Sequence, residues 1–120
     1  MVELLDLGDD RVIGLRVDGM IREEDMLAIT ARVEEALEQR DTLRAYVEVA
    51  RLTGIEARAL FEDLRLALRH WRKFERKAAV TDAEWIARVA EIVDPLFPSI
   101  EVRVFPTTEG DAARDWIRSE

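Results

Sequence analysis

The chain has 120 residues, which is the length of one domain, so residues 1–120 are expected to fold as a single domain. Hydrophobic residues make up 48% of the sequence, which is enough for one core and excludes a mainly disordered chain. The 26 acidic and 18 basic residues leave a net charge of −8, which disfavours nucleic acid and anionic membranes as partners.

The apolar pattern predicts two short strands near the start of the chain, over residues 2–7 and 12–17. The Gly-Asp-Asp sequence at residues 8–10 has the composition of a turn, so these strands are expected to form a hairpin. Apolar residues spaced three and four apart then predict a helix over residues 23–40. Apolar and polar residues alternate over residues 43–50, which predicts a strand with one buried face.

The second half of the chain alternates between predicted helices and strands. The first of these helices has an apolar stripe that includes Phe61, Leu64 and Leu68, which are expected to face the core. The predicted elements are a helix over residues 56–71, a strand over 78–80, a helix over 83–93, a strand over 100–104 and a closing helix around 112–117.

The resulting order, β-β-α-β-α-β-α-β-α, predicts an α/β fold with a five-stranded mixed sheet, because strands that alternate with helices pair in parallel through right-handed crossovers. The helices are expected mainly on one face of this sheet. The other face need not be buried, since several polar residues point to it: Arg16, Tyr46, Glu48, Glu101 and Arg103. Glu48 is expected to pair with Arg16 across neighbouring strands.

The residue types exclude several kinds of chemistry. The chain has no cysteine and one histidine, His70, which rules out thiolate catalysis and multi-histidine metal sites. It also has no glycine-rich phosphate loop, and no metal, cofactor or enzymatic activity is predicted. No apolar run reaches about 18 residues and the N-terminus lacks the basic region of a signal peptide, so a cytoplasmic location is expected. The preference for arginine over lysine is typical of a GC-rich bacterium.

Three threonines stand where a helix is predicted to begin: Thr53, Thr81 and Thr108. Each is followed three residues later by an acidic residue, so each is expected to cap the helix that follows its strand. Helix N-termini at the carboxyl edge of a parallel sheet also attract anions, so an anion site there remains an alternative.

The strongest charge asymmetry lies in residues 65–77, which hold six basic residues and one acidic residue. One interpretation is that these cations complement a helix dipole and lay their stems over apolar surface. The other is a docking patch for an acidic partner or an anionic ligand. The candidate binding residues are Arg65, Arg69, Arg72, Lys73 and Trp71.

Several segments of the chain resemble the small bacterial SpoIIAA-like proteins, which are relatives of the STAS (anti-sigma-factor antagonist) domain. The segments are ALFEDL at residues 59–64, HWRKFERKAAVTD at residues 70–82, VDGMI at residues 17–21 and EVRVF at residues 101–105, together with Trp85, Ala113 and Trp116. The resemblance covers essentially the whole chain. It implies a β-α superhelix fold, shared with STAS domains and with lipid-binding CRAL-TRIO domains.

The resemblance implies a non-enzymatic regulatory or protein-interaction module, and the basic segment over residues 65–77 predicts that its partner would have an acidic surface. A homodimer is also compatible with it. STAS regulators carry a phosphorylatable serine in an Asp-Ser-Ser-Gly-type loop, but residues 50–54 here read ARLTG, which leaves Thr53 as the candidate phosphoacceptor. Relatives also place a serine or threonine cap where this chain has Arg22. The alternative function is a small-ligand or lipid-binding carrier, by analogy with CRAL-TRIO domains.

Overall fold

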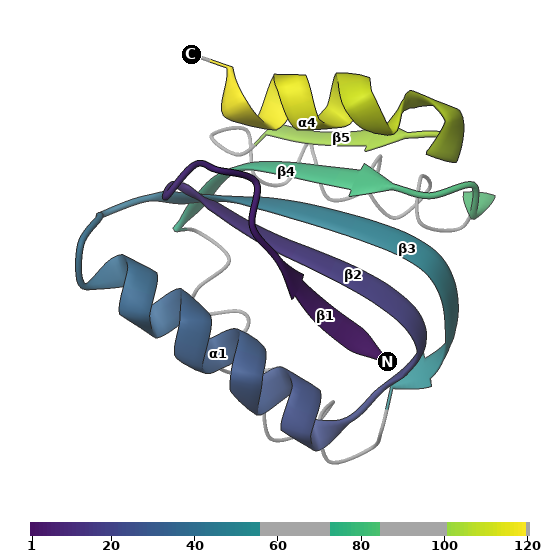
Figure 1. Cartoon of the computed structure of the whole chain (residues 1–120), viewed down its shortest axis with the longest axis horizontal. Coiled ribbons are helices and arrows are strands. Elements are labelled where there is room, and N and C mark those ends of the chain that lie inside the picture. Colours follow the sequence, from purple (N-terminus) through teal and green to yellow (C-terminus); the bar gives the residue numbers. More distant parts are fainter. Residues whose placement is uncertain (56–72, 85–100, 120) are drawn as a thin grey trace.

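The computed structural model describes residues 1–55, 73–84 and 101–119. These residues contain one five-stranded sheet whose strands follow the order β1-β2-β3-β4-β5 (Figure 1). The strands are β1 (Val2–Leu5), β2 (Val12–Ile21), β3 (Leu43–Ile55), β4 (Phe74–Val80) and β5 (Glu101–Phe105). The described helical elements are α1 (Glu23–Leu37), the short 3-10 helix η1 (Thr107–Glu109) and α4 (Gly110–Arg118).

The pairing of the strands makes the sheet mixed, as predicted. β1 pairs antiparallel with β2, whereas the β2–β3, β3–β4 and β4–β5 pairs are parallel. Because β2 to β5 run in the same direction, their first residues lie along one edge of the sheet, which we call the amino edge. Their last residues lie along the opposite, carboxyl edge.

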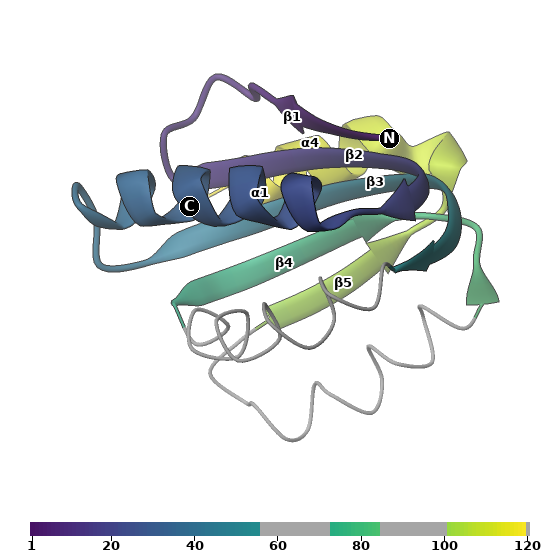
Figure 2. The same ribbon diagram turned by 90° about the horizontal axis from the view of Figure 1, so that it is seen from below.

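Helix α1 covers one face of the sheet, which we call the inner face (Figures 1 and 2). Its first turn is fixed by Asp25, whose carboxylate accepts the backbone N–H of Arg22 at 2.9 Å, so this chain caps the helix without a serine or threonine. The residues of α1 that face the sheet pack against apolar side chains of three strands. This cluster consists of Val33 and Ala36 of α1 with Ile13, Leu43 and Phe74.

Helix α4 lies on the opposite face, which we call the outer face (Figures 1 and 2). Ala113 and Ile117 are fully buried there against strand residues that include Val12, Ala78 and Tyr46. The expectation that this face need not be buried is therefore wrong, since Tyr46 has no exposed surface. The two described helices also lie on opposite faces, so these two do not follow the expected one-sided arrangement.

The structure lengthens three of the predicted strands, since β4 begins at Phe74 and not at residue 78. β2 continues from residue 17 to Ile21 and β3 from residue 50 to Ile55, because the two strands keep pairing as far as Ile21 and Ile55. Gly19 takes a φ of 104° next to a shift in register, a conformation that glycine adopts without strain. The predicted helix over residues 56–71, with Phe61, Leu64 and Leu68, lies outside the described residues, as does nearly all of the predicted helix over 83–93.

Candidate functional site

The amino edge holds the described part of the basic segment. Lys73 directly precedes β4, and its backbone carbonyl accepts the N–H of Leu43, the first residue of β3, at 2.7 Å. Its side chain is exposed and makes no hydrogen bond or ion pair within the described parts of the chain. Arg65, Arg69, Trp71 and Arg72 lie outside the described residues, so among the predicted docking residues the structure places Lys73 alone.

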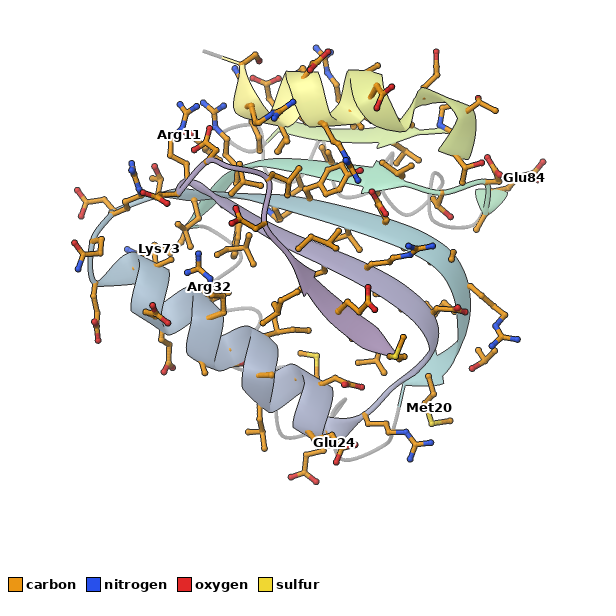
Figure 3. The ribbon with its side chains drawn as sticks, viewed as in Figure 1. Arg11, Met20, Glu24, Arg32, Lys73 and Glu84 are labelled. Atoms are coloured by element: carbon orange, nitrogen blue, oxygen red, sulfur yellow. The ribbon has the colours of Figure 1, made fainter. Side chains whose placement is uncertain are left out.

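A second exposed cation, Arg40, lies at the same edge in the loop between α1 and β3. Its side chain likewise pairs with no residue in the described ranges. Sequence reasoning missed Arg40 because it was assigned to the end of the helix, whereas α1 ends at Leu37. Lys73 and Arg11 both project at this edge, on the left in Figure 3, and Glu24 and Glu84 lie at the opposite one.

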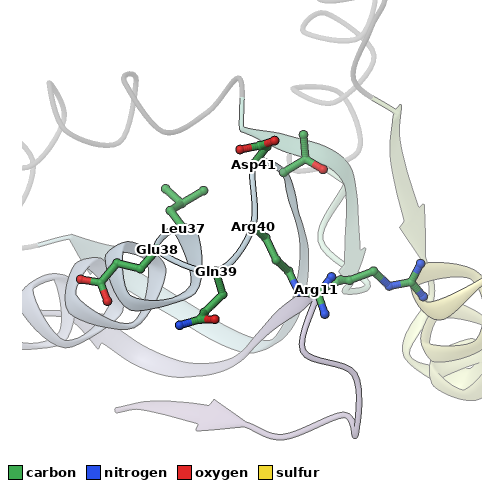
Figure 4. Close-up of a pocket in the computed structure, with 7 residues that line it drawn as sticks. Arg11, Leu37, Glu38, Gln39, Arg40 and Asp41 are labelled. Carbon is green, nitrogen blue, oxygen red and sulfur yellow. The ribbon is translucent and has the colours of Figure 1, made fainter.

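An open depression of about 440 Å³ adjoins Arg40 (Figure 4). Its lining is polar except for Leu37. The polar lining residues are Arg11, Glu38, Gln39, Arg40, Asp41 and Thr42. The Arg11 guanidinium points away from Glu38 and Gln39. It binds the Asp9 carboxylate at 2.8 Å and the backbone carbonyl of Arg118 at 3.0 Å, and its hydrogen bond lowers the pKa of Asp9 to about 2. Arg11 is therefore a structural residue, and Arg40 supplies the exposed charge.

The carboxyl edge places the candidate phosphoacceptor. Thr53 is exposed but lies inside β3, where the following residues Gly54 and Ile55 still pair with β2. A helix cap needs helical residues directly after it, so the prediction that Thr53 caps a helix is wrong. The strand pairing that extends β3 outweighs the local capping pattern.

The other two threonines differ from each other. Thr81 is buried and its hydroxyl oxygen accepts the backbone N–H of Ala83 at 3.1 Å, as a cap would. Thr108 lies within η1, and α4 begins at Gly110 after Glu109 with no side-chain cap, so the prediction for Thr108 is wrong.

A small notch of about 160 Å³ lies at the carboxyl edge, between the end of β3 and the segments that follow β4 and β5. One wall is fixed by Asp82, whose carboxylate accepts the backbone N–H of Thr107 at 3.0 Å and its hydroxyl at 2.6 Å. These hydrogen bonds lower the pKa of Asp82. Ligand pockets for small molecules are about 300–1,000 Å³, so the notch fits a single side chain or a small ion.

The most elaborate polar contacts lie under α4 on the outer face. The Tyr46 hydroxyl donates to the Glu48 carboxylate at 2.6 Å and accepts from Arg114 of α4 at 3.2 Å, while Arg114 also binds Glu48 at 2.7 Å. Arg16 lies opposite Glu48 in the ladder, as predicted, and its charge helps to lower the pKa of Glu48, but the direct ion pair of Glu48 is with Arg114. Sequence spacing could not identify Arg114, which is distant in the chain.

Burial and hydrogen bonding shift these pKa values in a consistent way. Burial raises the pKa of Tyr46, and the bond to Glu48 raises it further. Burial also acts to raise the pKa of Glu48, but the hydrogen bonds from Tyr46 and Arg114 outweigh it and leave that pKa below its usual value. The network is therefore a neutral tyrosine between a carboxylate and a guanidinium, which holds α4 in place and leaves no free base.

The C-terminal end of α4 is held by arginines from the sheet. Arg44 is buried, binds Glu75 at 2.8 Å and donates to the backbone carbonyls of Ile117, at 2.9 Å, and Ser119. Arg76 donates to the Ser119 carbonyl at 3.0 Å. Positive charge at a helix C-terminus complements the helix dipole, so these arginines are structural.

Two further observations describe the chemistry of the described residues. They contain no cluster of histidine, aspartate and glutamate that would hold a metal ion. Within the same residues, no helix has the length and apolar character needed to cross a membrane.

The family of the chain follows from its sequence and its fold. The SpoIIAA-like family model matches residues 12–118. The chain belongs to the SpoIIAA-like family. A crystal structure of an uncharacterized protein of the DUF3478 family from Shewanella loihica PV-4, with a SpoIIAA-like fold, superposes with a TM-score of 0.76. At 24% identity, over 98% of this chain and 92% of that one, the likeness shows the fold. No curated protein matches the chain.

Proposed function

We propose that this SpoIIAA-like chain is a cytoplasmic, non-enzymatic interaction module whose amino edge docks an acidic surface of a partner protein. The observation that carries the proposal is the exposed charge of Lys73, which pairs with no described residue and lies within a segment of six basic residues, in a chain of net charge −8. An unpaired cation on an acidic protein is a favourable contact for a carboxylate and unfavourable for a second basic surface.

A second cation supports this choice of edge. Arg40 is exposed at the amino edge and pairs with no residue in the described parts of the chain. Arg65, Arg69, Arg72 and Trp71 would complete the docking surface, with Trp71 as its aromatic anchor, because tryptophan and arginine contribute most to interface binding energy.

Two charge-matched variants test the proposal. Arg40/Lys73→Glu alters the amino edge, and Arg22/Arg51→Glu makes the same change in net charge with exposed residues near the carboxyl edge. Each tagged protein is used to recover partners from a lysate of the organism that encodes it, with quantitative mass spectrometry. We expect an acidic partner that binds the wild type and Arg22/Arg51→Glu, dissociates with salt and is lost from Arg40/Lys73→Glu.

Equal recovery of the same partners by both folded variants would refute the amino-edge assignment. The Arg65/Arg69/Arg72→Glu variant extends the test, and we expect it to lose the same partner. Because the charges act through exposed groups, raising the salt concentration shortens their range to below about 8 Å and should weaken the complex.

The carrier alternative is tested separately by native mass spectrometry after gentle purification. The depression at Arg40 is open and lined almost entirely by polar side chains, and the notch at the carboxyl edge has a volume of only about 160 Å³, so both favour an interaction module over a lipid carrier. A stoichiometric bound lipid would overturn the proposal. The same spectra record whether Thr53 carries phosphate, which the interaction module does not require.

A further inference from the structure

The outermost strand β5 offers a second surface, which runs along the side of the sheet from the amino edge to the carboxyl edge. β5 is the last strand in the sheet order, so its outer side pairs with no strand in the described parts of the chain. The backbone N–H and C=O groups along such an edge are able to bind another extended segment. Glu101, Arg103 and Phe105 of β5 point to the outer face, on the same side as α4, and Glu101 and Arg103 are exposed.

Arg103 is held beside this edge with its hydrogen-bonding capacity unused. Its guanidinium carbon lies 4.8 Å from the centroid of the Trp116 ring, and the side chain makes no hydrogen bond or ion pair with any described residue. Glu101, two residues away on the same face, forms no ion pair with it. The Arg103 charge is thus oriented by the indole but not neutralised.

Trp116 is itself fixed from several sides. Arg76 stacks on its ring at 5.5 Å and donates to its backbone carbonyl at 3.3 Å, and the ring contacts Phe105 with centroids 6.1 Å apart. The Ser119 hydroxyl donates to the same carbonyl at 2.7 Å. A guanidinium resting on a fixed ring loses less conformational freedom on binding than a mobile one, which favours it as a binding residue.

We propose that β5 and the Arg103–Trp116 pair form a second docking site, which binds an extended acidic segment of a partner protein by strand addition. The segment pairs its backbone with the open side of β5. Its side chains on the outer face then lie about 5 Å from those of β5, within reach of the Arg103 guanidinium. A glutamate or aspartate there binds Arg103 through two parallel hydrogen bonds, which is the geometry that arginine favours.

A second copy of this chain fits the edge less well. Antiparallel pairing of two β5 strands about their centre places Arg103 opposite Arg103 of the other copy, and like charges directly opposite are destabilising. An acidic segment with an extended backbone brings the complementary charge to Arg103 without that clash.

The test uses the whole chain and a blocked pentapeptide of alternating valine and glutamate, observed by backbone and indole NMR. We expect the peptide to shift the amide resonances of residues 101–105 and the indole N–H of Trp116. Replacing glutamate by glutamine in the peptide, or Arg103→Gln in the protein, should weaken binding about tenfold, since a charge-assisted hydrogen bond is lost. Arg16→Gln, on the same face but on β2, serves as the control and should bind as the wild type.

Each other outcome overturns the proposal in a recognisable way. No shift in residues 101–105 at millimolar peptide means that the edge does not accept a strand. Shifts caused by sodium acetate alone would indicate a free-anion site. Shifts that grow with protein concentration in the absence of peptide would assign the edge to a second copy. Shifts confined to residues 40 and 73 would contradict this site while supporting the amino-edge function, so the two proposals fail independently.

Discussion

Helix α1 packs on the inner face of the sheet through aliphatic and aromatic side chains, whereas α4 combines apolar packing on the outer face with hydrogen bonds from arginines. The inner cluster joins Val33 and Ala36 of α1 to Ile13, Leu43 and Phe74. On the outer face, Arg114 binds Tyr46 and Glu48, and Arg44 and Arg76 bind backbone carbonyls at the end of α4. The same strands thus present one side that packs through apolar contacts and one side that adds hydrogen bonds to its apolar contacts.

The difference shows what a short helix needs. α4 spans nine residues, and isolated helices shorter than about 12 residues are marginal in water. It buries Ala113 and Ile117 completely in the apolar cluster of the outer face, and apolar packing by itself is non-directional. Hydrogen bonds at its middle and at its C-terminus supply that direction, because they are satisfied in one orientation only.

Removing the ring of Tyr46 should give the largest effect. Tyr46→Ala opens a cavity under α4 and is expected to reduce the free energy of unfolding by about 3–5 kcal/mol. Tyr46→Phe keeps the ring but removes the hydroxyl, and should cost about 1 kcal/mol. Urea denaturation measures both. Leu43→Ala on the inner face is the matched comparison, and its expected cost is about 2–5 kcal/mol. If Tyr46→Phe cost as much as Tyr46→Ala, the hydroxyl and not the ring would secure the outer face.

Arg44 tests the polar anchoring of α4 directly. Arg44→Met keeps the length of the side chain but removes the Arg44 hydrogen bonds to the carbonyls of Ile117 and Ser119, of which the second keeps its bond from Arg76, so we expect a loss of about 2–3 kcal/mol. Hydrogen exchange should increase first in α4. Arg51→Met removes an exposed ion pair with Asp18 and should change stability by less than about 0.5 kcal/mol. Equal effects of the two variants would mean that α4 does not depend on Arg44.

The side of the sheet to which each residue points was predictable, because the period of two in β3 places Leu43 and Ala45 on one face and Tyr46 and Glu48 on the other. What covers the outer face was not predictable. A polar residue in a strand faces either water or a buried partner, and the partner of Glu48, Arg114, is 66 positions away in the sequence. Arg44 is likewise buried against a partner distant in the sequence, the carbonyl of Ile117.

The strand ends and the site residues also depend on contacts that a local sequence pattern does not reveal. Glycine is depleted in strands, so Gly19 and Gly54 would be expected to end them. Pairing between β2 and β3 nevertheless continues through both residues. At the amino edge, the charge excess of residues 65–77 is evident in the sequence, whereas the exposure of Arg40 depends on where α1 ends. The Arg103–Trp116 contact depends on α4 lying over β5, which no local pattern encodes.

Gly14 tests how closely the outer face is packed at β1. A Cβ on Gly14 would meet the side chain of Leu7 and would lie 2.9 Å from the backbone oxygen of Leu5. Gly14→Ala therefore requires the β1 segment to shift and should cost about 1–3 kcal/mol. Gly110→Ala is the control, because nothing lies near its Cβ position and alanine favours the helix. Thermal unfolding should show a lower midpoint for Gly14→Ala and an unchanged or higher one for Gly110→Ala.

Lys77 is a charged residue among the apolar side chains of the inner face. We expect its replacement to change the free energy of unfolding least, and to raise it where the other substitutions lower it. It lies opposite Ala45 and Val102 in the ladder, and burial lowers its pKa from 10.5 to about 8. Between pH 8 and 10.5 the unfolded chain therefore holds a proton that the folded chain has released. The contribution of this lysine to stability is most unfavourable below about pH 8 and improves as the pH rises toward 10.5.

Lys77→Met removes the cost of burying this charge. We expect the variant to be about 1 kcal/mol more stable than the wild type at pH 7, which is well below the full effect of the pKa shift because the ammonium remains partly in water. The advantage should shrink between pH 8 and 10.5, as the wild-type lysine loses its proton in both states. Urea denaturation at a series of pH values measures this difference. Lys77 donates a hydrogen bond to the Phe74 carbonyl at 3.4 Å. A variant less stable than the wild type at pH 7 would show that the polar contacts of Lys77 outweigh the cost of burying its charge. The inner face would then resemble the outer face in its use of polar contacts.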